Sequence, residues 1–138
     1  MLRNIAAKLK FLQVLANQSI TADTNTTGVD CEAFGSMGFL VSVGAFAFDG
    51  SNKIDLKMQY SDDNVTFVDV PESEMYSVDG AAPIAKSLKA AGDASKVHFL
   101  EYRGAKRYAR LALDVTGTVS VGVSVATVGG HSELMPPL

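Results

Sequence analysis

The chain has 138 residues, of which 47% are hydrophobic and 20% are charged, and its net charge at pH 7 is −3. This length suits one domain whose core is large enough to fold without disulfides or metal. The negative balance argues against general nucleic-acid binding, which needs a basic surface, and the single cysteine, Cys31, excludes an internal disulfide.

The N-terminal segment predicts a helix over residues 2–16. Apolar residues recur in it at three- and four-residue spacing, which places them on one helix face: Leu2, Ile5, Leu9, Leu12 and Ala16. We expect neither a signal peptide nor a membrane span, because the apolar run is short and is interrupted by Gln13. Such a helix packs either on its own domain or on a neighbouring subunit.

The middle of the chain predicts strands. Residues 38–50 are largely apolar, and Gly44 within them indicates a bulge or a close backbone approach. Residues 53–61 alternate between apolar and polar side chains, the period of a strand with one dry face and one wet face. The sequence SDDN (61–64) favours a turn, because Asp and Asn side chains can bond the local backbone. Residues 53–70 therefore predict a β-hairpin.

Residues 71–95 are the least regular part and predict a long surface connection with a short helical turn near residues 84–91. Alternation returns in the run 108–115 and again in 119–126. In this last run one face is valine and the other holds only small residues. The small face suits packing under another sheet or against another protein.

About seven or eight short strands joined by turns predict a mainly β fold, an antiparallel β-sandwich or jelly roll with a short N-terminal helix. The expected organisation has an N-terminal amphipathic helix or arm over residues 1–17 and a β-sandwich domain over residues 18–130. An extended tail over residues 131–138 follows, because its Pro-Pro pair resists regular structure.

Residue types that are common in active sites and metal sites are present, but the sequence does not place catalytic or ligand partners near them. The chain has no GxSxG, Walker, HExxH or CxxC motif. His98 lies in a strand-like run, His131 lies in a Gly-rich segment, and the run 62–64 lacks the register of a calcium loop. Acidic neighbours raise the pKa of the Cys31 thiol, the wrong direction for a nucleophile. We therefore expect no enzyme, no cofactor, and no catalytic or metal-binding residue.

A basic turn lies within EYRGAKRYAR (101–110), where Arg103, Lys106 and Arg107 surround Gly104 and Ala105. Three interpretations are open. The turn is a structural device whose long side chains cover the edges of the sheet, or it contacts an acidic patch on a protein partner. In the third, its tyrosines stack on single-stranded nucleic acid. The acidic chain weighs against the third, and we expect no nucleic-acid partner.

Taken in order, these motifs resemble those of small structural proteins of tailed bacteriophages. Members share an SDD hairpin turn, a YxGxKRYxRL strand, and an apolar strand that leads to a late Gly and Pro. In this sequence the pattern falls on Ser61, Asp62 and Asp63, then on Tyr102, Gly104, Lys106, Arg107, Tyr108, Arg110 and Leu111, and finally on Gly129, Gly130 and Pro136. The resemblance covers roughly residues 18–136 and implies a β-sandwich that is built into the virion.

The resemblance implies a decoration or cement protein on the capsid surface, assembled in the cytoplasm of the host bacterium. Its expected partners are the major capsid protein and further copies of itself as a dimer or trimer, with no membrane partner. Such a protein bridges capsid subunits and shifts the equilibrium toward the intact shell. The candidate protein-interface residues are Leu2, Ile5, Leu9, Leu12, Arg103, Lys106, Arg107, Met135 and Pro136.

Two alternatives stay open. One is a head-tail or tail-associated structural subunit, which would occur in few copies per particle. The other is a β-sandwich that binds host glycans. The second is less favoured, because such modules place aromatic residues on an exposed platform, whereas this chain has no tryptophan and four tyrosines.

Overall fold

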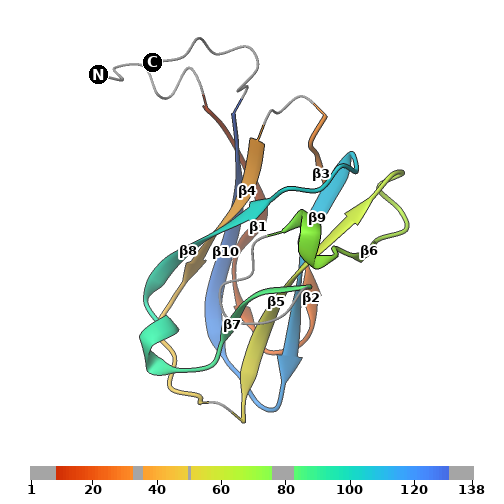
Figure 1. The fold of residues 1–138 in the computed structure, drawn as a ribbon. Coiled ribbons are helices and arrows are strands. Elements are labelled where there is room, and N and C mark those ends of the chain that lie inside the picture. The colour runs from red at the N-terminus through yellow and green to blue at the C-terminus, as the bar shows by residue number, and fades with distance from the viewer. Residues whose placement is uncertain (1–8, 33–35, 50, 76–82, 131–138) are drawn as a thin grey trace.

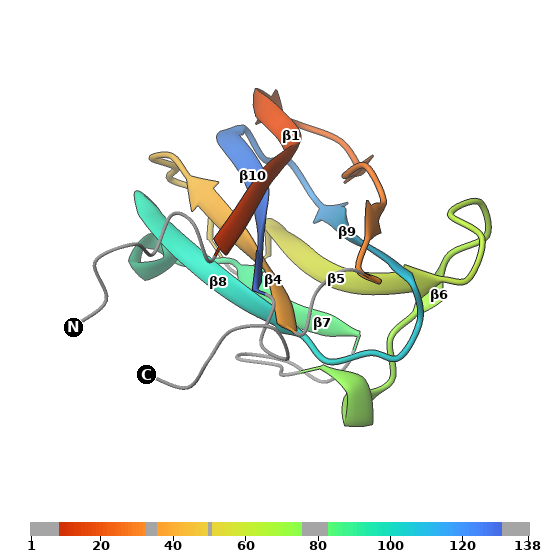
Figure 2. The ribbon, with the colours of Figure 1, turned by 90° about the horizontal axis from the view of Figure 1, so that it is seen from above.

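The computed structural model describes residues 9–32, 36–49, 51–75 and 83–130, which form two antiparallel sheets that lie face to face (Figures 1 and 2). Sheet A has four strands, in the order β1 (Leu9–Ile20), β10 (Val121–Gly130), β4 (Ser36–Val43) and β8 (Lys96–Tyr102). The mainly β, antiparallel architecture predicted from the sequence is confirmed.

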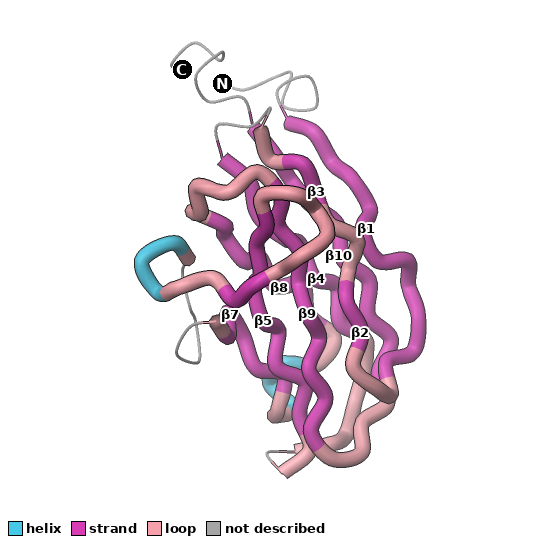
Figure 3. Tube along the Cα trace, turned by 90° about the vertical axis from the view of Figure 1, so that its right-hand side faces the viewer, coloured by secondary structure: helices cyan, strands magenta, loops and turns pink. Residues whose placement is uncertain are grey.

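Sheet B has six strands, and Figure 3 looks onto it. Its central pair is β9 (Tyr108–Thr116) and β5 (Lys53–Ser61). Two short strands, β2 (Thr24–Asn25) and β3 (Val29–Asp30), pair with β9, whereas β6 (Val68–Asp69) and β7 (Ile84–Leu88) pair with β5. Two short 3₁₀ helices, η1 (Glu72–Glu74) and η2 (Ala91–Asp93), lie in the connections. Among the described residues, no helix has the length and apolar character needed to span a membrane.

The core fills the space between the two sheets. The period of two predicted for 108–115 and 119–126 is confirmed, because every second residue in the first part of β9 and along most of β10 is buried. Side chains from both sheets share this core and are almost completely buried, among them Phe39, Val41, Ile54, Leu56, Met58, Leu111, Leu113 and Val123. Alternating apolar residues therefore determine which face of each strand turns inward.

The helix predicted over residues 2–16 is wrong where the structure describes it. Residues 9–16 belong to β1, an edge strand that pairs with β10, and residues 2–8 lie outside the described residues. The strand also runs across the boundary expected after residue 17. Tertiary pairing with β10 overrides the local helical pattern.

The strand that replaces the predicted helix is irregular. Register shifts interrupt β1 between Gln13 and Leu15 and again between Leu15 and Gln18. Leu12 and Leu15 consequently both lie opposite inward-facing residues of β10, although an unbroken strand would place residues three apart on opposite faces. The apolar face predicted for the helix is not the buried one, since Leu12 is 54% exposed and only Val14 and Leu15 are buried within residues 9–16.

The hairpin predicted over residues 53–70 is confirmed, since β5 pairs antiparallel with β6. The helical turn predicted near residues 84–91 is wrong for most of its length. Ile84–Leu88 form strand β7 on the edge of β5, and helical geometry is confined to η2. The close backbone approach expected at Gly44 is present, because its N–H donates to the Gly122 carbonyl at 2.9 Å.

Candidate interaction surface

The candidate interface residues that the structure describes come mainly from one end of the fold, which we call the 103–107 end. In sheet A, Leu9 pairs with Gly130, and Gly130 pairs with Ser36. Tyr102 at the end of β8 pairs with the next residue of β4, Met37. The start of β1, the end of β10 and the end of β8 therefore share this end, at the top of Figure 1.

Sheet B contributes to the same end. Residues 103–107 connect β8 in sheet A to β9 in sheet B, and the first residue of β9, Tyr108, pairs with Ser61. The turn that follows Ser61 thus lies beside the basic turn. Leu12 is further along β1 and is 54% exposed. The four other candidates lie outside the described residues: Leu2, Ile5, Met135 and Pro136.

Acidic residues of the chain itself pair with the basic turn. Lys106 Nζ lies 2.9 Å from Asp62 Oδ2, and Arg103 Nε lies 3.0 Å from Glu101 Oε1. The guanidinium of Arg107 binds both carboxylate oxygens of Asp30, at 3.1 and 2.8 Å. This bidentate bond lowers the pKa of Asp30 and raises that of Arg107. The geometry favours a structural role for the turn, in addition to any contact that it makes.

Arg110, on the exposed face of sheet B, also has its partners within the chain. Its Nε donates to Gln59 Oε1 at 2.9 Å, and its guanidinium lies 4.2 Å from the centroid of the Phe67 ring. The guanidinium is therefore held by a hydrogen bond and a cation–π contact within the chain.

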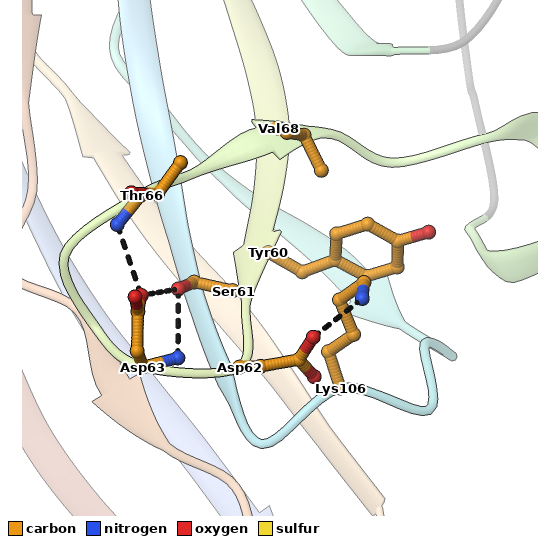
Figure 4. A pocket seen from close by; sticks show the side chains of 7 residues that line it. All are labelled: Tyr60, Ser61, Asp62, Asp63, Thr66, Val68 and Lys106. Atoms are coloured by element: carbon orange, nitrogen blue, oxygen red, sulfur yellow. Dashed lines mark hydrogen bonds and ion pairs between the residues drawn. The ribbon is translucent and has the colours of Figure 1, made fainter.

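A small pocket lies between the basic turn and the turn after β5, as Figure 4 shows. The Lys106 side chain crosses it, with Nζ 5.2 Å from the centroid of the Tyr60 ring. The hydrogen bond to Asp62 raises the pKa of Lys106. The pocket encloses about 220 Å³, less than the roughly 300 Å³ at which small-molecule sites begin. It does not have the size of a ligand site.

The turn over residues 61–66 is built as the SDDN sequence predicts. Ser61 Oγ accepts the backbone N–H groups of Asp63 and Asn64 at 3.1 and 3.0 Å. Asp63 Oδ1 accepts those of Val65 and Thr66 at 2.9 and 3.0 Å. These backbone bonds, with one from the Ser61 hydroxyl, lower the pKa of Asp63 to about 2. Two short polar side chains therefore fix this turn beside Lys106.

Glu74 organises the 103–107 end, although no local pattern in the sequence points to it. Its Oε2 accepts the Tyr60 hydroxyl at 2.9 Å, and its Oε1 accepts the Ala105 N–H at 3.0 Å. Its carbonyl oxygen accepts the N–H of Arg103 at 3.0 Å. Glu74 comes from η1, in the segment that the sequence presents as an irregular connection, so only the folded chain reveals its role.

Cys31 and His98 are both held by contacts within the chain. Burial, followed by the charge of Asp30, raises the pKa of the Cys31 thiol to about 12, and Cys31 Sγ lies 3.4 Å from the Val29 carbonyl oxygen. His98 in β8 is half-buried, with Nε2 3.1 Å from the Asp93 carbonyl oxygen. Within the described ranges, no group of three or more His, Cys, Asp or Glu side chains is placed to hold a metal ion.

A second surface is the outer side of sheet A. The small residues of β10, including Ser124 and Ala126, face this side, and no described element of the chain covers it. From the sequence, we expect these small residues of β10 to pack against another sheet or another protein. Exposed aromatic residues on the neighbouring strands, Phe11 and Phe99, share the face. The sequence did not identify these two residues as a surface. Its local pattern predicts a helix at Phe11, and it does not indicate which face of its strand Phe99 lies on.

Compared with known proteins, the chain matches no protein-family model and has no significant match among curated proteins.

Proposed function

We propose that the chain is a non-enzymatic structural protein of a tailed-bacteriophage virion that binds the assembled capsid as a decoration or cement protein. One observation carries the proposal: candidate contact residues from separate parts of the sequence, Leu9 and residues 103–107, meet at one end of the fold. The sequence resemblance to small virion proteins supplies the class of partner. In this proposal the two-layer β fold is a β-sandwich, and its 103–107 end faces the shell.

A contact through this end suits the role of a cement protein. Residues 103–107 are held by backbone hydrogen bonds to Glu74 and by ion pairs to other segments, so little conformational entropy is lost when they meet a rigid partner. A protein that bridges two capsid subunits binds the shell and not the free subunit. Mass action then stabilises the shell.

Co-sedimentation tests the proposal. The purified chain is mixed with heads assembled from the major capsid protein of the same phage in the absence of this chain, and bound copies are counted per shell. We expect saturation at a number comparable to the capsid subunits. The variant Lys106→Glu should bind about tenfold more weakly or worse, because it reverses a charge at the proposed contact.

The matched control is Lys89→Glu, because Lys89 is an exposed lysine at the opposite end of sheet B, next to Leu88, which pairs with Ile54. It should bind like the wild-type chain. Saturation at only a few copies would contradict a cement protein and favour a neck or tail subunit. No binding to heads would overturn the proposal, and host glycans would be the next ligands to test.

A further inference from the structure

The outer face of sheet A is an apolar surface without a partner in the chain as the structure describes it. Phe11 is 58% exposed, Val97 61% and Phe99 52%. The strand registers place these three side chains on the same side as the half-buried Leu40 of β4. Exposed apolar side chains gathered on one sheet face mark a protein interaction surface.

Charge selects the kind of partner. On the described strands of sheet A, the registers turn one charged side chain toward this face, Glu101, and Arg103 Nε lies 3.0 Å from it. A face with almost no net charge does not select an acidic or basic protein, nor nucleic acid. It also raises no electrostatic barrier to a second copy of the same face.

One large–small pair near the centre of the face is complementary to itself under a two-fold rotation. The strand register aligns Ala126 of β10 beside Leu40 of β4, and Val128 of β10 beside Gly38 of β4. The second pair offers no hollow, because the ring of Phe99 in the same chain fills the space above Gly38. A two-fold axis that runs along the line between the two strands sets Leu40 of each copy over Ala126 of the other. Such large-on-small contacts are how two sheets interdigitate.

The face is also large enough for such a contact. Four strands, with eight residue pairs between β10 and β4, give a face of about 19 by 27 Å at usual sheet spacings, or about 500 Å² per copy. Two copies therefore bury about 1,000 Å², the lower limit for a specific interface. Area alone does not set the affinity, and an interface at this limit belongs to the weak, transient class.

We propose that the outer face of sheet A binds the same face of a second copy, in a two-fold dimer centred on β10 and β4. The dimer stacks two sheets of each copy into four layers. It leaves Lys106 and Arg107 of the 103–107 end, which pair with Asp62 and Asp30, free for another partner. This inference goes beyond the proposed virion role and holds whether or not the chain binds a capsid, since it rests on a different surface.

Analytical ultracentrifugation of the full chain tests the proposal. We expect the wild-type chain to dimerise below about 100 μM. Ala126→Arg should weaken the dimer about tenfold or more, because its long charged side chain occupies the space that Leu40 of the second copy fills. Phe99→Lys should act in the same direction. Val68→Lys is the matched control, because Val68 is 49% exposed on β6 of sheet B, and it should dimerise like wild type.

A measurement on the unaltered chain keeps the proposal testable if a variant fails to fold. Hydroxyl-radical footprinting should show that the oxidation of Phe99 falls as protein concentration rises, whereas the oxidation of Val65 stays constant. A wild-type monomer at about 100 μM, or a dimer that neither Ala126→Arg nor Phe99→Lys weakens, would overturn the proposal. A monomer in which Phe99 is protected would also overturn it and would point to residues 1–8 or 131–138 as the cover. The Lys106→Glu variant should dimerise normally, so failure of capsid binding and failure of dimerisation are distinguishable.

Discussion

Lys106 and Asp62 lie 44 residues apart in the sequence, yet the Lys106 ammonium donates to the Asp62 carboxylate at 2.9 Å. The contact joins the β8–β9 connection to the turn after β5. It also explains how a mildly acidic chain carries a compact group of basic residues. Each charge of the basic turn has an acidic partner in the folded chain, and the partners of Lys106 and Arg107 come from distant segments.

The first prediction concerns the pH dependence of stability. The pKa of Asp63 is about 2 in the folded chain, below its ordinary value of 3.8. A lowered pKa stabilises the fold above pH 3.8, and this contribution is lost as pH falls toward 2. We expect Asp63→Asn to reduce the fall in the urea midpoint over this range. Thr66→Ser is the control, because it changes an exposed, uncharged side chain of the same turn, and it should leave the fall unchanged. Equal pH profiles for wild type and Asp63→Asn would contradict the prediction.

Gly104 provides a second test. A Cβ at this position would lie about 2.3 Å from the hydroxyl oxygen of Tyr102, and Tyr102 is itself buried and bonded to the Lys106 carbonyl at 3.0 Å. We expect Gly104→Ala to lower the free energy of unfolding by about 1–3 kcal/mol, the usual cost of overpacking. Gly92→Ala is the control, because nothing lies within 4 Å of its Cβ. Its effect in urea unfolding should stay within about 0.5 kcal/mol, and similar losses for both variants would argue against the Tyr102 contact.

A third prediction concerns the Cys31 thiol. Its pKa of about 12 in the folded chain leaves very little thiolate at pH 8. We expect iodoacetamide to modify native Cys31 at least about a hundredfold more slowly than Cys31 in the chain unfolded by urea. Mass spectrometry over a time course measures both rates, with Cys31→Ser as the blank. Comparable rates would show that the thiol is neither desolvated nor affected by Asp30.

A fourth prediction contrasts two phenylalanines on neighbouring strands of sheet A. Phe39 on β4 is completely buried, whereas Phe99 on β8 is 52% exposed. We expect Phe39→Ala to lower the free energy of unfolding by about 3–5 kcal/mol, and Phe99→Ala to lower it by about 1 kcal/mol or less. Urea unfolding is measured at a concentration at which the chain is monomeric. A large loss for Phe99→Ala would mean that Phe99 belongs to the core of the single chain.

The hairpin over residues 53–70 and the strand over residues 108–115 were predictable because their signal is local. Alternating apolar and polar side chains predict a strand directly, and the sequence SDDN predicts the turn between the two strands. The prediction for residues 84–88 was wrong because their structure depends on a distant part of the chain. Their Ala and Lys content favours a helix, but the free edge of β5 supplies hydrogen-bond partners that only the folded chain provides.

The candidate surfaces were less predictable than the fold. Arg103, Lys106 and Arg107 were identified as a group, but their acidic partners and Glu74 come from segments that the sequence does not link to them. The outer face of sheet A was visible only as a run of small residues in β10. Its apolar part, Phe11 and Phe99, comes from two strands that β10 and β4 separate.

By itself, the sequence determined that this protein is mainly β, because a period of two in hydrophobicity is a property of neighbouring residues. Only the tertiary structure decided that residues 9–16 extend sheet A and that no described part of the chain covers the outer face of this sheet. Those outcomes depend on pairing between distant segments. There, bulges alter the spacing of Leu12 and Leu15, and the hydrogen bonds of a neighbouring strand outweigh local propensity.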